Sequence, residues 1–513
     1  MHIDMTLIET IRKYILDHTD EMTSDIISLC SIDSVKGKAE GGKPYGPGPH
    51  KALMAAKKLC ESYGFSTKNY YDRVITADLL SGAGNADAGK APEAFGAAPV
   101  PAAPHQLDIL AHMDVVAPGD GWTVTEAFKP VIKGDAIYGR GASDDKGPAV
   151  AALYAMRAIK ELGIGISKNC RLILGSDEEC GSSDIKYYYK DEEEAPMTFS
   201  PDAEFPLINI EKGQFRGELS KHFNVINTSP QLISCESGST INIVPGKADA
   251  VIAGFTKAEL EAAAEAVSQT LGEEFEYTIS PEETYEGSEG GSGSAQHSSE
   301  QGTALHLHIE GQTAHASTPE RGVNAAVVML QILAELDFDN RELNAAIKKM
   351  AILFQYGDHC GSQLGIDIED ERSGCTTLSP DILRADENAV SLKFDSRTAV
   401  SADEKTLIAE VGERAEFAGF NFEYSFVPAH AVDADSDFVK TLLGCYEAVT
   451  GRDGRAVAIG GGTYVHSLKN GVAFGAVGED TDTHMHGADE FMPISELQDA
   501  AVVYALAIAE LCR

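Results

Sequence analysis

The chain has 513 residues, of which 43% are hydrophobic and 24% are charged, a normal balance for a soluble globular protein. Two or more domains are expected at this length, because a single core rarely grows beyond about 300 residues. The net charge of −39 repels phosphate backbones and anionic lipid, which argues against nucleic acid or a membrane as a partner.

The N-terminal 22 residues predict an amphipathic helix, because acidic side chains are spread through them and the apolar core of a signal peptide is missing. We expect no membrane span, since the sequence has no run of 18 or more apolar residues. The nine cysteines include no C-x-x-C pair, which favours a reducing compartment. We therefore expect a cytoplasmic protein.

Strands alternate with helices up to about residue 212, as in the helical pattern of residues 147–163, and the same style returns after 428. This predicts an α/β catalytic domain, a mixed and mostly parallel sheet between helices, formed by residues 1–212 and 429–513. Residues 213–428 are then an inserted lid or substrate domain.

The inserted region contains a faint repeat. Strand ADAVIAGF, helix AELEAAAEAVSQTLG and strand FEYTI are echoed by strand AVSLKFDSR, helix EKTLIAEVGERAEFAG and strand FEYSF. We expect an α+β domain made of a duplicated ferredoxin-like module, with ordinary α+β patterning as the alternative. Two segments without periodicity, 82–105 and 280–302, are predicted to be surface excursions.

Five polar motifs occur where apolar runs meet turns. They are LDILAHMDVV (107–116), YGRGASDDKGP (138–148), RLILGSDEECG (171–181), FSPDAEFP (199–206) and THMHGADE (483–490). Ligands of open α/β sheets bind at the carboxyl ends of the strands. The five motifs together therefore predict one shared metal site with nitrogen and oxygen ligands.

Each motif also has an ordinary structural interpretation. A lone H-x-D, as in His112 and Asp114, is more often structural than catalytic. Asp144 and Asp145 precede a helix and fit an N-cap, although capping needs only one of them. Acidic pairs such as Glu178 and Glu179 usually lie on solvated faces, but these two follow a strand of buried character.

No cysteine that could supply a zinc-binding thiolate pair accompanies these motifs. Nitrogen and oxygen ligands suit zinc, manganese or cobalt. Two such ions bridged by one carboxylate can share a hydroxide and polarise a carbonyl together. The sequence thus favours hydrolytic chemistry.

Seven motifs, taken in chain order, closely resemble those of the co-catalytic dizinc aminopeptidase-like peptidases. They are HMDVVAPGDGW, YGRGASDDKGP, GSDEECGSSD, FSPDAEFP, GQTAHAS, GGGTY and MHGADE. Carboxypeptidase G, aminoacylase, carnosinase and succinyl-diaminopimelate desuccinylase belong to this family. DDKGP together with FSPDAEFPLINIEKG is most similar to the PepV-type dipeptidases. The resemblance covers nearly the whole chain except the two excursions.

The resemblance implies a pair of divalent metal ions, with zinc expected and manganese or cobalt as alternatives. His112 and Asp202 would hold one ion, Glu179 and His486 the other, and Asp144 would bridge them.

Two further residues of this domain receive roles from the resemblance. Asp114 would orient His112, which fixes the ring direction and tautomer. Glu178 would act as general base and then as general acid. The family pattern also implies a cis peptide between Asp144 and Asp145.

The lid would contribute substrate contacts. His315 would stabilise the oxyanion with Asn242 nearby, and Arg397 would bind the terminal carboxylate of the substrate. Gly461 and Thr463, in the glycine-rich turn of the catalytic domain, would line the same pocket. The KFDSR motif departs from the family pattern because no aromatic-Pro pair follows its arginine.

This resemblance leads us to expect a cytoplasmic metallodipeptidase that acts on short unblocked peptides. We expect a monomer, because the enlarged PepV-type lid completes the site within one chain, with a homodimer as the alternative. An N-acyl amino acid deacylase of the same family is the nearest alternative activity. A catalytically inactive relative that binds peptides or metals is a third hypothesis.

Overall fold

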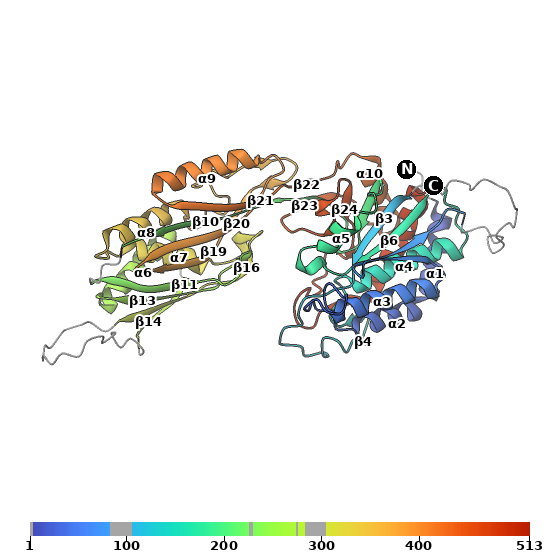
Figure 1. The fold of residues 1–513 in the computed structure, drawn as a ribbon, viewed down its shortest axis with the longest axis horizontal. Helices are drawn as coiled ribbons and strands as arrows, with labels where there is room; N and C mark the ends of the chain where they lie inside the picture. The colour runs from blue at the N-terminus through green and yellow to red at the C-terminus, as the bar shows by residue number, and fades with distance from the viewer. Residues whose placement is uncertain (1–3, 83–104, 225–228, 273–274, 283–303) are drawn as a thin grey trace. The chain divides into compact units, whose positions relative to one another are not determined.

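The computed structural model describes residues 4–82, 105–224, 229–272, 275–282 and 304–513. The two predicted excursions, 82–105 and 280–302, lie almost entirely outside the described residues. The chain divides into two compact units (Figure 1). The first contains Met1–Glu211 and His430–Arg513, and the second contains Lys212–Ala429.

A nine-stranded mixed sheet forms the centre of the first unit. Its central pairings are parallel, and the pairings toward its two edges are antiparallel apart from one parallel side strand. The fold is therefore α/β as predicted, with more antiparallel pairing than expected, because edge strands such as β1 and β2 are joined by short turns. In sheet order the strands are β1 (Ser66–Tyr70), β2 (Val74–Leu79), β6 (Asn169–Gly175), β3 (His105–His112), β7 (Met197–Ser200), β24 (Gly471–Ala473), β9 (Leu207–Glu211) and β22 (His430–Ala431), with β23 (Ala456–Ile459) also paired to β9.

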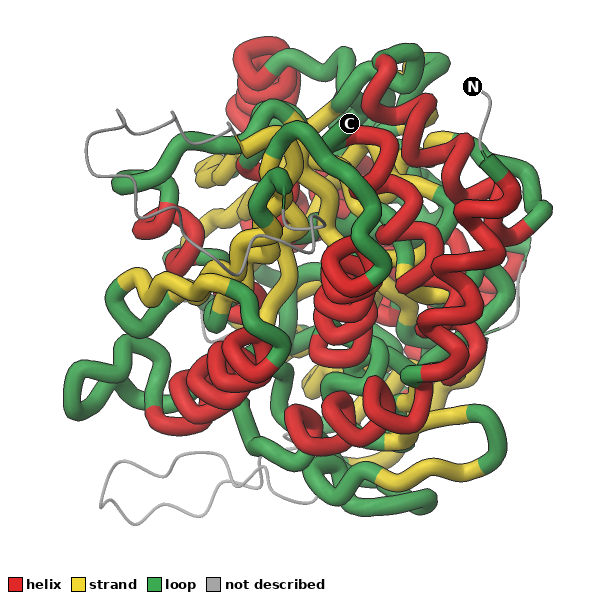
Figure 2. Tube along the Cα trace, turned by 90° about the vertical axis from the view of Figure 1, so that its right-hand side faces the viewer, coloured by secondary structure: helices red, strands yellow, loops and turns green. Residues whose placement is uncertain are grey.

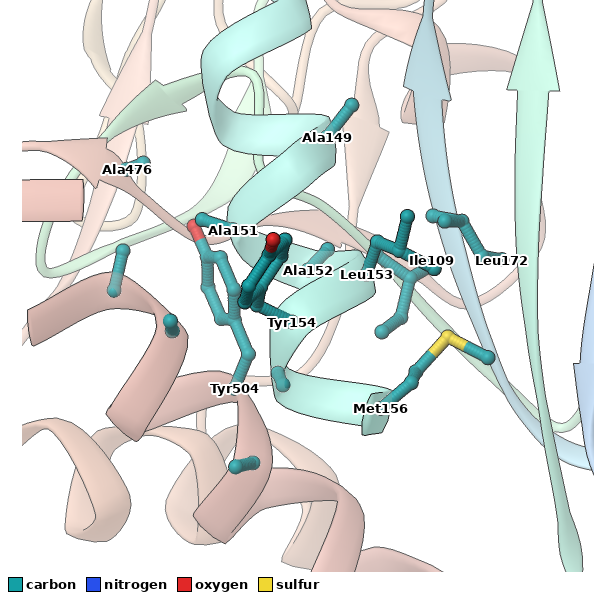
Figure 3. Close-up of a cluster of buried hydrophobic side chains, with 14 of the residues drawn as sticks. Ile109, Ala149, Ala151, Ala152, Leu153, Tyr154, Met156, Leu172, Ala476 and Tyr504 are labelled. Atoms are coloured by element: carbon teal, nitrogen blue, oxygen red, sulfur yellow. The ribbon is translucent and has the colours of Figure 1, made fainter. Parts of the chain in front are cut away.

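Helices pack against this sheet (Figure 1, Figure 2). Helix α4 is buried along most of its length, because alanine side chains let it approach both the sheet and α11 closely (Figure 3). Gly147 in its first turn has no space for a side chain, since a Cβ would lie 2.0 Å from the carbonyl oxygen of Ala142. The helices of this unit are α1 (Met5–Asp17), α2 (Thr19–Cys30), α3 (Pro47–Ser62), α4 (Lys146–Glu161), α5 (Ser183–Tyr188), α10 (Asp437–Thr450) and α11 (Ile494–Leu511).

The expected amphipathic helix at the N-terminus is present as α1, but it ends at Asp17 instead of running through all 22 residues. Two helices, α1 and α2, meet at His18, whose φ of −112° interrupts the helical path. The His18 ring stacks on Tyr14 and its Nδ1 lies 2.8 Å from the Tyr14 carbonyl oxygen, so the side chain satisfies the last turn of α1.

Short elements complete this unit. They are β4 (Val131–Lys133), β5 (Ala136–Tyr138) and β26 (Phe491–Pro493) in one small sheet, β8 (Ala203–Glu204) paired with β25 (Ala476–Val477), and the 3-10 turns η1 (Glu178–Cys180) and η3 (Tyr464–Ser467).

The second unit is built on an eight-stranded antiparallel sheet. Apolar side chains such as Phe215 and Phe394 pack with four helices, while residues that alternate with them along the strands are polar. In sheet order the strands are β14 (Glu276–Pro281), β15 (Leu305–Glu310), β13 (Lys247–Ala253), β11 (Gln231–Ser237), β19 (Thr377–Asp386), β20 (Ala389–Thr398), β10 (Gly213–His222) and β21 (Asn421–Val427). The helices are α6 (Lys257–Leu271), α7 (Ala325–Glu335), α8 (Arg341–Leu353) and α9 (Glu404–Ala418). The remaining elements are β12 (Ile243–Val244), β16 (Ala314–His315), β17 (Glu369–Asp370), β18 (Gly374–Cys375) and η2 (Pro319–Arg321).

The predicted repeat is formed in this sheet. One copy is β13, α6 and β14, and the other is β20, α9 and β21. Each copy encloses one additional strand, β15 or β10, and each continues inward to β11 or β19. The sheet therefore has the same order when it is followed inward from either edge, which is the arrangement that a duplicated module predicts.

Candidate metal centre

Three neighbouring parallel strands carry polar residues to one edge of the first unit's sheet. Strand β3 ends at His112, β6 leads into η1 with Glu178 and Glu179, and β7 is followed by Asp202. Because parallel strands place their carboxyl ends at the same edge, these side chains are brought together.

Asp144 lies between two imidazoles. Its Oδ1 is 2.9 Å from His112 Nε2, and its Oδ2 is 2.9 Å from His486 Nε2. Each oxygen of one carboxylate thus faces a different histidine, although the two histidines are far apart in the sequence.

The remaining predicted ligands flank this central group. Asp202 Oδ2 is 3.6 Å from His112 Nε2, and Glu179 Oε2 is 3.4 Å from His486 Nε2. In the described residues, two groups of possible ligand atoms lie within 4.8 Å of one another. They are His112 with Glu178 and Asp202, and His112 with Asp144 and Glu179.

The donors at this centre fit divalent metal ions. His112 Nε2 is buried and makes no hydrogen bond of acceptable geometry, although carboxylates lie close to it. Burial alone would lower the pKa of His112, but Asp114, Asp144 and Asp202 raise it well above its usual value. Asp144 and Glu179 likewise raise the pKa of His486 to about 10. Carboxylates outnumber the imidazoles, and this excess of negative charge is what a cation would neutralise.

Asp114 connects His112 to the glutamate pair. Its carbonyl oxygen lies 3.0 Å from His112 Nδ1, which directs Nε2 toward Asp144. Its carboxylate accepts the backbone N–H groups of Glu178 and Glu179, both at 3.2 Å. The residue therefore contacts His112 mainly through its backbone and uses its side chain to fix η1.

The helix-cap interpretation of the two aspartates does not describe their contacts. Asp145 occupies the N-cap position of α4, but its side chain makes no cap hydrogen bond. Its Oδ2 instead accepts the backbone N–H of His112 at 3.0 Å. The peptide between Asp144 and Asp145 is cis, as the resemblance implied.

Two residues that the sequence analysis missed join the loops of Asp144 and His486. Glu490 is fully buried, and its Oε1 accepts the N–H groups of Gly141 and Ser143, both at 3.0 Å. Its Oε2 accepts from Arg140 at 2.6 Å, and Arg140 also donates to the His486 carbonyl oxygen at 3.2 Å. The sequence signal that could have identified Glu490 is its position directly before the apolar strand β26.

Gly461 and Thr463 lie in the turn between β23 and η3. This turn is held by Glu211, another buried acid that the sequence analysis did not single out. Glu211 Oε1 accepts from the Thr463 hydroxyl at 2.8 Å, and Oε2 lies 2.8 Å from His466 Nδ1. Glu211 ends the apolar strand β9, the same pattern that pointed to the predicted ligands.

His315 and Asn242 are neighbours in the second unit. Strands β12 and β16 pair Ile243 with His315, and the Asn242 carbonyl oxygen accepts the N–H of Ala316 at 2.9 Å. Asn242 has a φ of +86°, and the Asp381 carboxylate accepts its N–H at 2.7 Å. Burial and then Arg397 lower the pKa of His315, which favours a neutral imidazole.

Arg397 is almost completely buried. Its Nε donates to Asp395 Oδ1 at 2.6 Å, and only 3% of the residue is exposed. On the neighbouring strand, Arg216 donates to the other oxygen of Asp395 at 2.8 Å, and a third of its side chain is exposed. Arg216 was missed, because a single arginine in the alternating strand β10 looks like an ordinary surface residue.

A comparison with protein families decides the identity of the fold and the site. The model of Peptidase family M20/M25/M40 matches residues 109–510. The chain belongs to this peptidase family. The family resemblance of the motifs is therefore confirmed, and the enzyme is a metallopeptidase, a hydrolase of peptide bonds.

Relatives in the M20 family match over nearly the full length. The chain is 34% identical over 514 residues to the Bacillus subtilis (strain 168) protein named "Putative dipeptidase YtjP", covering 99% of both chains. It is 32% identical over 512 residues to a Staphylococcus epidermidis protein named "Putative dipeptidase", covering 98% of this chain and 99% of the relative.

Solved structures share the fold. Aminoacylhistidine dipeptidase from Vibrio alginolyticus matches with a TM-score of 0.55 and 14% identity over 96% of each chain. Human carnosine dipeptidase 1 matches with a TM-score of 0.54 and 14% identity over 99% of each chain. Among the described residues, no helix is long and apolar enough to cross a membrane.

Proposed function

We propose that this M20 enzyme is a dipeptidase that hydrolyses short unblocked peptides at a centre of two divalent metal ions. The position of Asp144 carries the proposal, because its two oxygens lie 2.9 Å from His112 and His486, respectively. A carboxylate that faces two imidazoles in this way is suited to bridge a pair of cations.

The ligand sets follow from these contacts. His112 and Asp202 would hold one ion, Glu179 and His486 the other, and Asp144 would hold both. Nitrogen and oxygen donors accept zinc, which we expect, and also manganese or cobalt. Bound ions would polarise the peptide carbonyl and make water acidic enough to attack near neutral pH.

Glu178 is proposed as the group that moves the proton. Its carboxylate would accept a proton from the attacking water and donate it to the leaving amine nitrogen. A carboxyl oxygen of Glu178 lies within 4.8 Å of ligand atoms of His112 and Asp202, which supports this role. Its backbone is held by Asp114, so the side chain can be directed at the substrate.

The unit Lys212–Ala429 is proposed as a lid that binds the substrate. His315 would donate a hydrogen bond to the carbonyl oxygen as negative charge develops there, with Asn242 beside it. Arg397 would bind the terminal carboxylate, and we add Arg216 to this role because more of its guanidinium is accessible. Gly461 and Thr463 would line the pocket from the catalytic unit. Closure of the lid would exclude water and complete the site.

The names of the two bacterial relatives support a dipeptidase rather than a larger peptidase. We propose a cytoplasmic monomer, since the enlarged second unit contains both the histidine and the arginines that the site needs. A homodimer is the alternative that size measurements in solution would reveal.

The test compares free dipeptides with their N-acetylated forms. Purified enzyme is stripped of metal, reloaded with zinc, manganese or cobalt in turn, and assayed by chromatography of the products. We expect turnover of free dipeptides, a metal stoichiometry of two per chain, and no turnover without metal. Turnover of only the acetylated compounds would make the enzyme a deacylase, and no turnover of either would indicate an inactive relative.

A further inference from the structure

Two cysteines of the second unit have their thiols in contact. Cys360 lies in the turn that follows α8, and Cys375 ends the short strand β18. Their Sγ atoms are 2.7 Å apart, and both residues are half-buried. The pair is therefore close enough for a sulfur–sulfur bond and open enough for a small reagent.

The backbone holds both cysteines in place without help from the thiols. Beside Cys360, the His359 carbonyl oxygen accepts the N–H of Leu378 at 2.7 Å. Beside Cys375, Thr376 donates its N–H to Ile368 at 2.8 Å. The contact between the sulfurs is therefore imposed by the fold around them.

The turn that carries Cys360 has its own anchor. The Asp358 carboxylate accepts the N–H groups of Gly361, Ser362 and Gln363 at 2.9, 2.9 and 3.0 Å. On the other side, the Cys375 carbonyl oxygen accepts from Lys212 Nζ at 2.6 Å. A bond between the cysteines would join these two anchored segments.

The other cysteines do not offer such a pair. All nine lie within the described residues, and six of those outside the Cys360 and Cys375 pair are buried. Cys170 and Cys512 also interact, and Cys512 contributes to raising the Cys170 pKa, but burial shields both from reagents. Cys180 is exposed, but it belongs to the first unit, whereas Cys360 and Cys375 belong to the second.

We propose that Cys360 and Cys375 form a reversible dithiol–disulfide site that is oxidised by low-molecular-weight disulfides. One cysteine thiolate attacks a sulfur of the small disulfide and releases one small thiol. The second cysteine then attacks the protein sulfur of the mixed disulfide and releases the other small thiol. The pair loses two electrons and two protons, and the small disulfide is reduced to two thiols.

The experiment uses the full-length Cys180→Ser enzyme, because exposed Cys180 would otherwise react with the reagent by itself. The protein is incubated with oxidised glutathione and then denatured. Free thiols of the denatured protein are counted once before and once after treatment with a reductant. We expect a loss of two of the eight thiols, no bound glutathione, and recovery with reductant. Peptide mapping should show residues 360 and 375 linked.

Matched variants distinguish this site from other thiols. Adding Cys360→Ser or Cys375→Ser should abolish the loss of two thiols and leave at most one bound glutathione. Adding Cys170→Ser, which removes one member of the buried pair Cys170 and Cys512, should still allow the loss of two thiols. Thermal unfolding of each variant shows whether it is folded. A linkage through any other cysteine, a stable mixed disulfide in the Cys180→Ser enzyme, or eight unreacted thiols would overturn the proposal.

Discussion

Glu178 and Glu179 are adjacent in the chain, and we propose different roles for them at the candidate metal centre. Asp114 accepts both of their backbone N–H groups and so fixes the turn from which the side chains diverge. Glu179 lies 3.4 Å from His486 and groups with His112 and Asp144, whereas Glu178 groups with His112 and Asp202. One turn can therefore provide both a ligand and a proton carrier.

This division of roles predicts different outcomes for two amide substitutions. Glu178→Gln should lower kcat by roughly 10²–10⁴-fold, because the proton carrier is lost, while metal content stays near that of the unchanged enzyme. Asp144→Asn should lose both activity and metal, because the bridging charge is removed. Elemental analysis with steady-state kinetics measures both, and full activity of the glutamine variant would exclude Glu178 from the mechanism.

The buried pair Arg140–Glu490 should matter for stability. Its side chains are 1% and 0% exposed. Glu490→Gln leaves the guanidinium without its counter-charge and should cost about 3–5 kcal/mol of unfolding free energy. The partly exposed pair Arg12–Asp499 is the control, and Asp499→Asn should cost less than about 1 kcal/mol. Urea unfolding of metal-free protein compares the two, and equal costs would contradict the structural role of Glu490.

Which site residues could be predicted depended on their local context. His112 and Glu179 follow apolar strands in motifs that resemble a known family, so the sequence predicted their place at one edge of the sheet, and the resemblance supplied their proposed role as metal ligands. Glu490 and Arg140 are partners across 350 residues, and nothing in the sequence near one indicates the other. Arg216 could not be recognised because its proposed role depends on its contact with Asp395 on a neighbouring strand, and that pairing is set by the register of the sheet.

At the scale of elements, the beginning of α4 determines where Asp144, the proposed bridging residue, lies. Gly147 touches the Ala142 carbonyl group so closely that any side chain must displace the loop between them, which contains Asp144. The helix can approach the loop only because this position lacks a Cβ.

Two helical glycines test this close approach. Gly147→Ala should destabilise the protein by about 1–3 kcal/mol through overpacking and weaken metal binding. Gly412 lies within α9, and a Cβ added there would have no neighbouring atom within 4 Å, so Gly412→Ala should stabilise by up to about 1 kcal/mol. Denaturant unfolding and metal titration give both quantities. An alanine at 147 that leaves metal affinity unchanged would contradict the argument.

Local elements were predicted better than their arrangement. The strand–helix–strand repeat was visible, because its pattern lies within about 40 residues in each copy. The position of β10 between β20 and β21 in the sheet was not visible in the sequence. Strand β10 precedes both of them by more than 150 residues, and their pairing leaves no local signal. The break at His18 was missed for a different reason, since no glycine or proline marks it.

For the whole molecule, the two units have separate hydrophobic cores, and the proposed metal ligands belong to only one of them. A ligand stabilises the state that binds it by RT ln(1 + [L]/Kd), about 2.7 kcal/mol at 100 times Kd. Metal should therefore stabilise the first unit and leave the second unchanged.

Calorimetry with zinc and with a chelator measures this difference. We expect two unfolding transitions, of which one moves to lower temperature when metal is removed. In Asp144→Asn the same transition should no longer respond to metal. Equal shifts of both transitions would show that the units unfold as one.

The chain enters and leaves the second unit through paired strands. Glu211 lies opposite His430 on β9 and β22, and Gln214 lies opposite Val427 on β10 and β21. Partners in such a ladder have Cα atoms only about 5 Å apart. The insertion thus begins and ends at nearly one point, so a short linker could replace it, or a foreign domain with adjacent termini could be grafted there, without moving the strands that carry the proposed ligands.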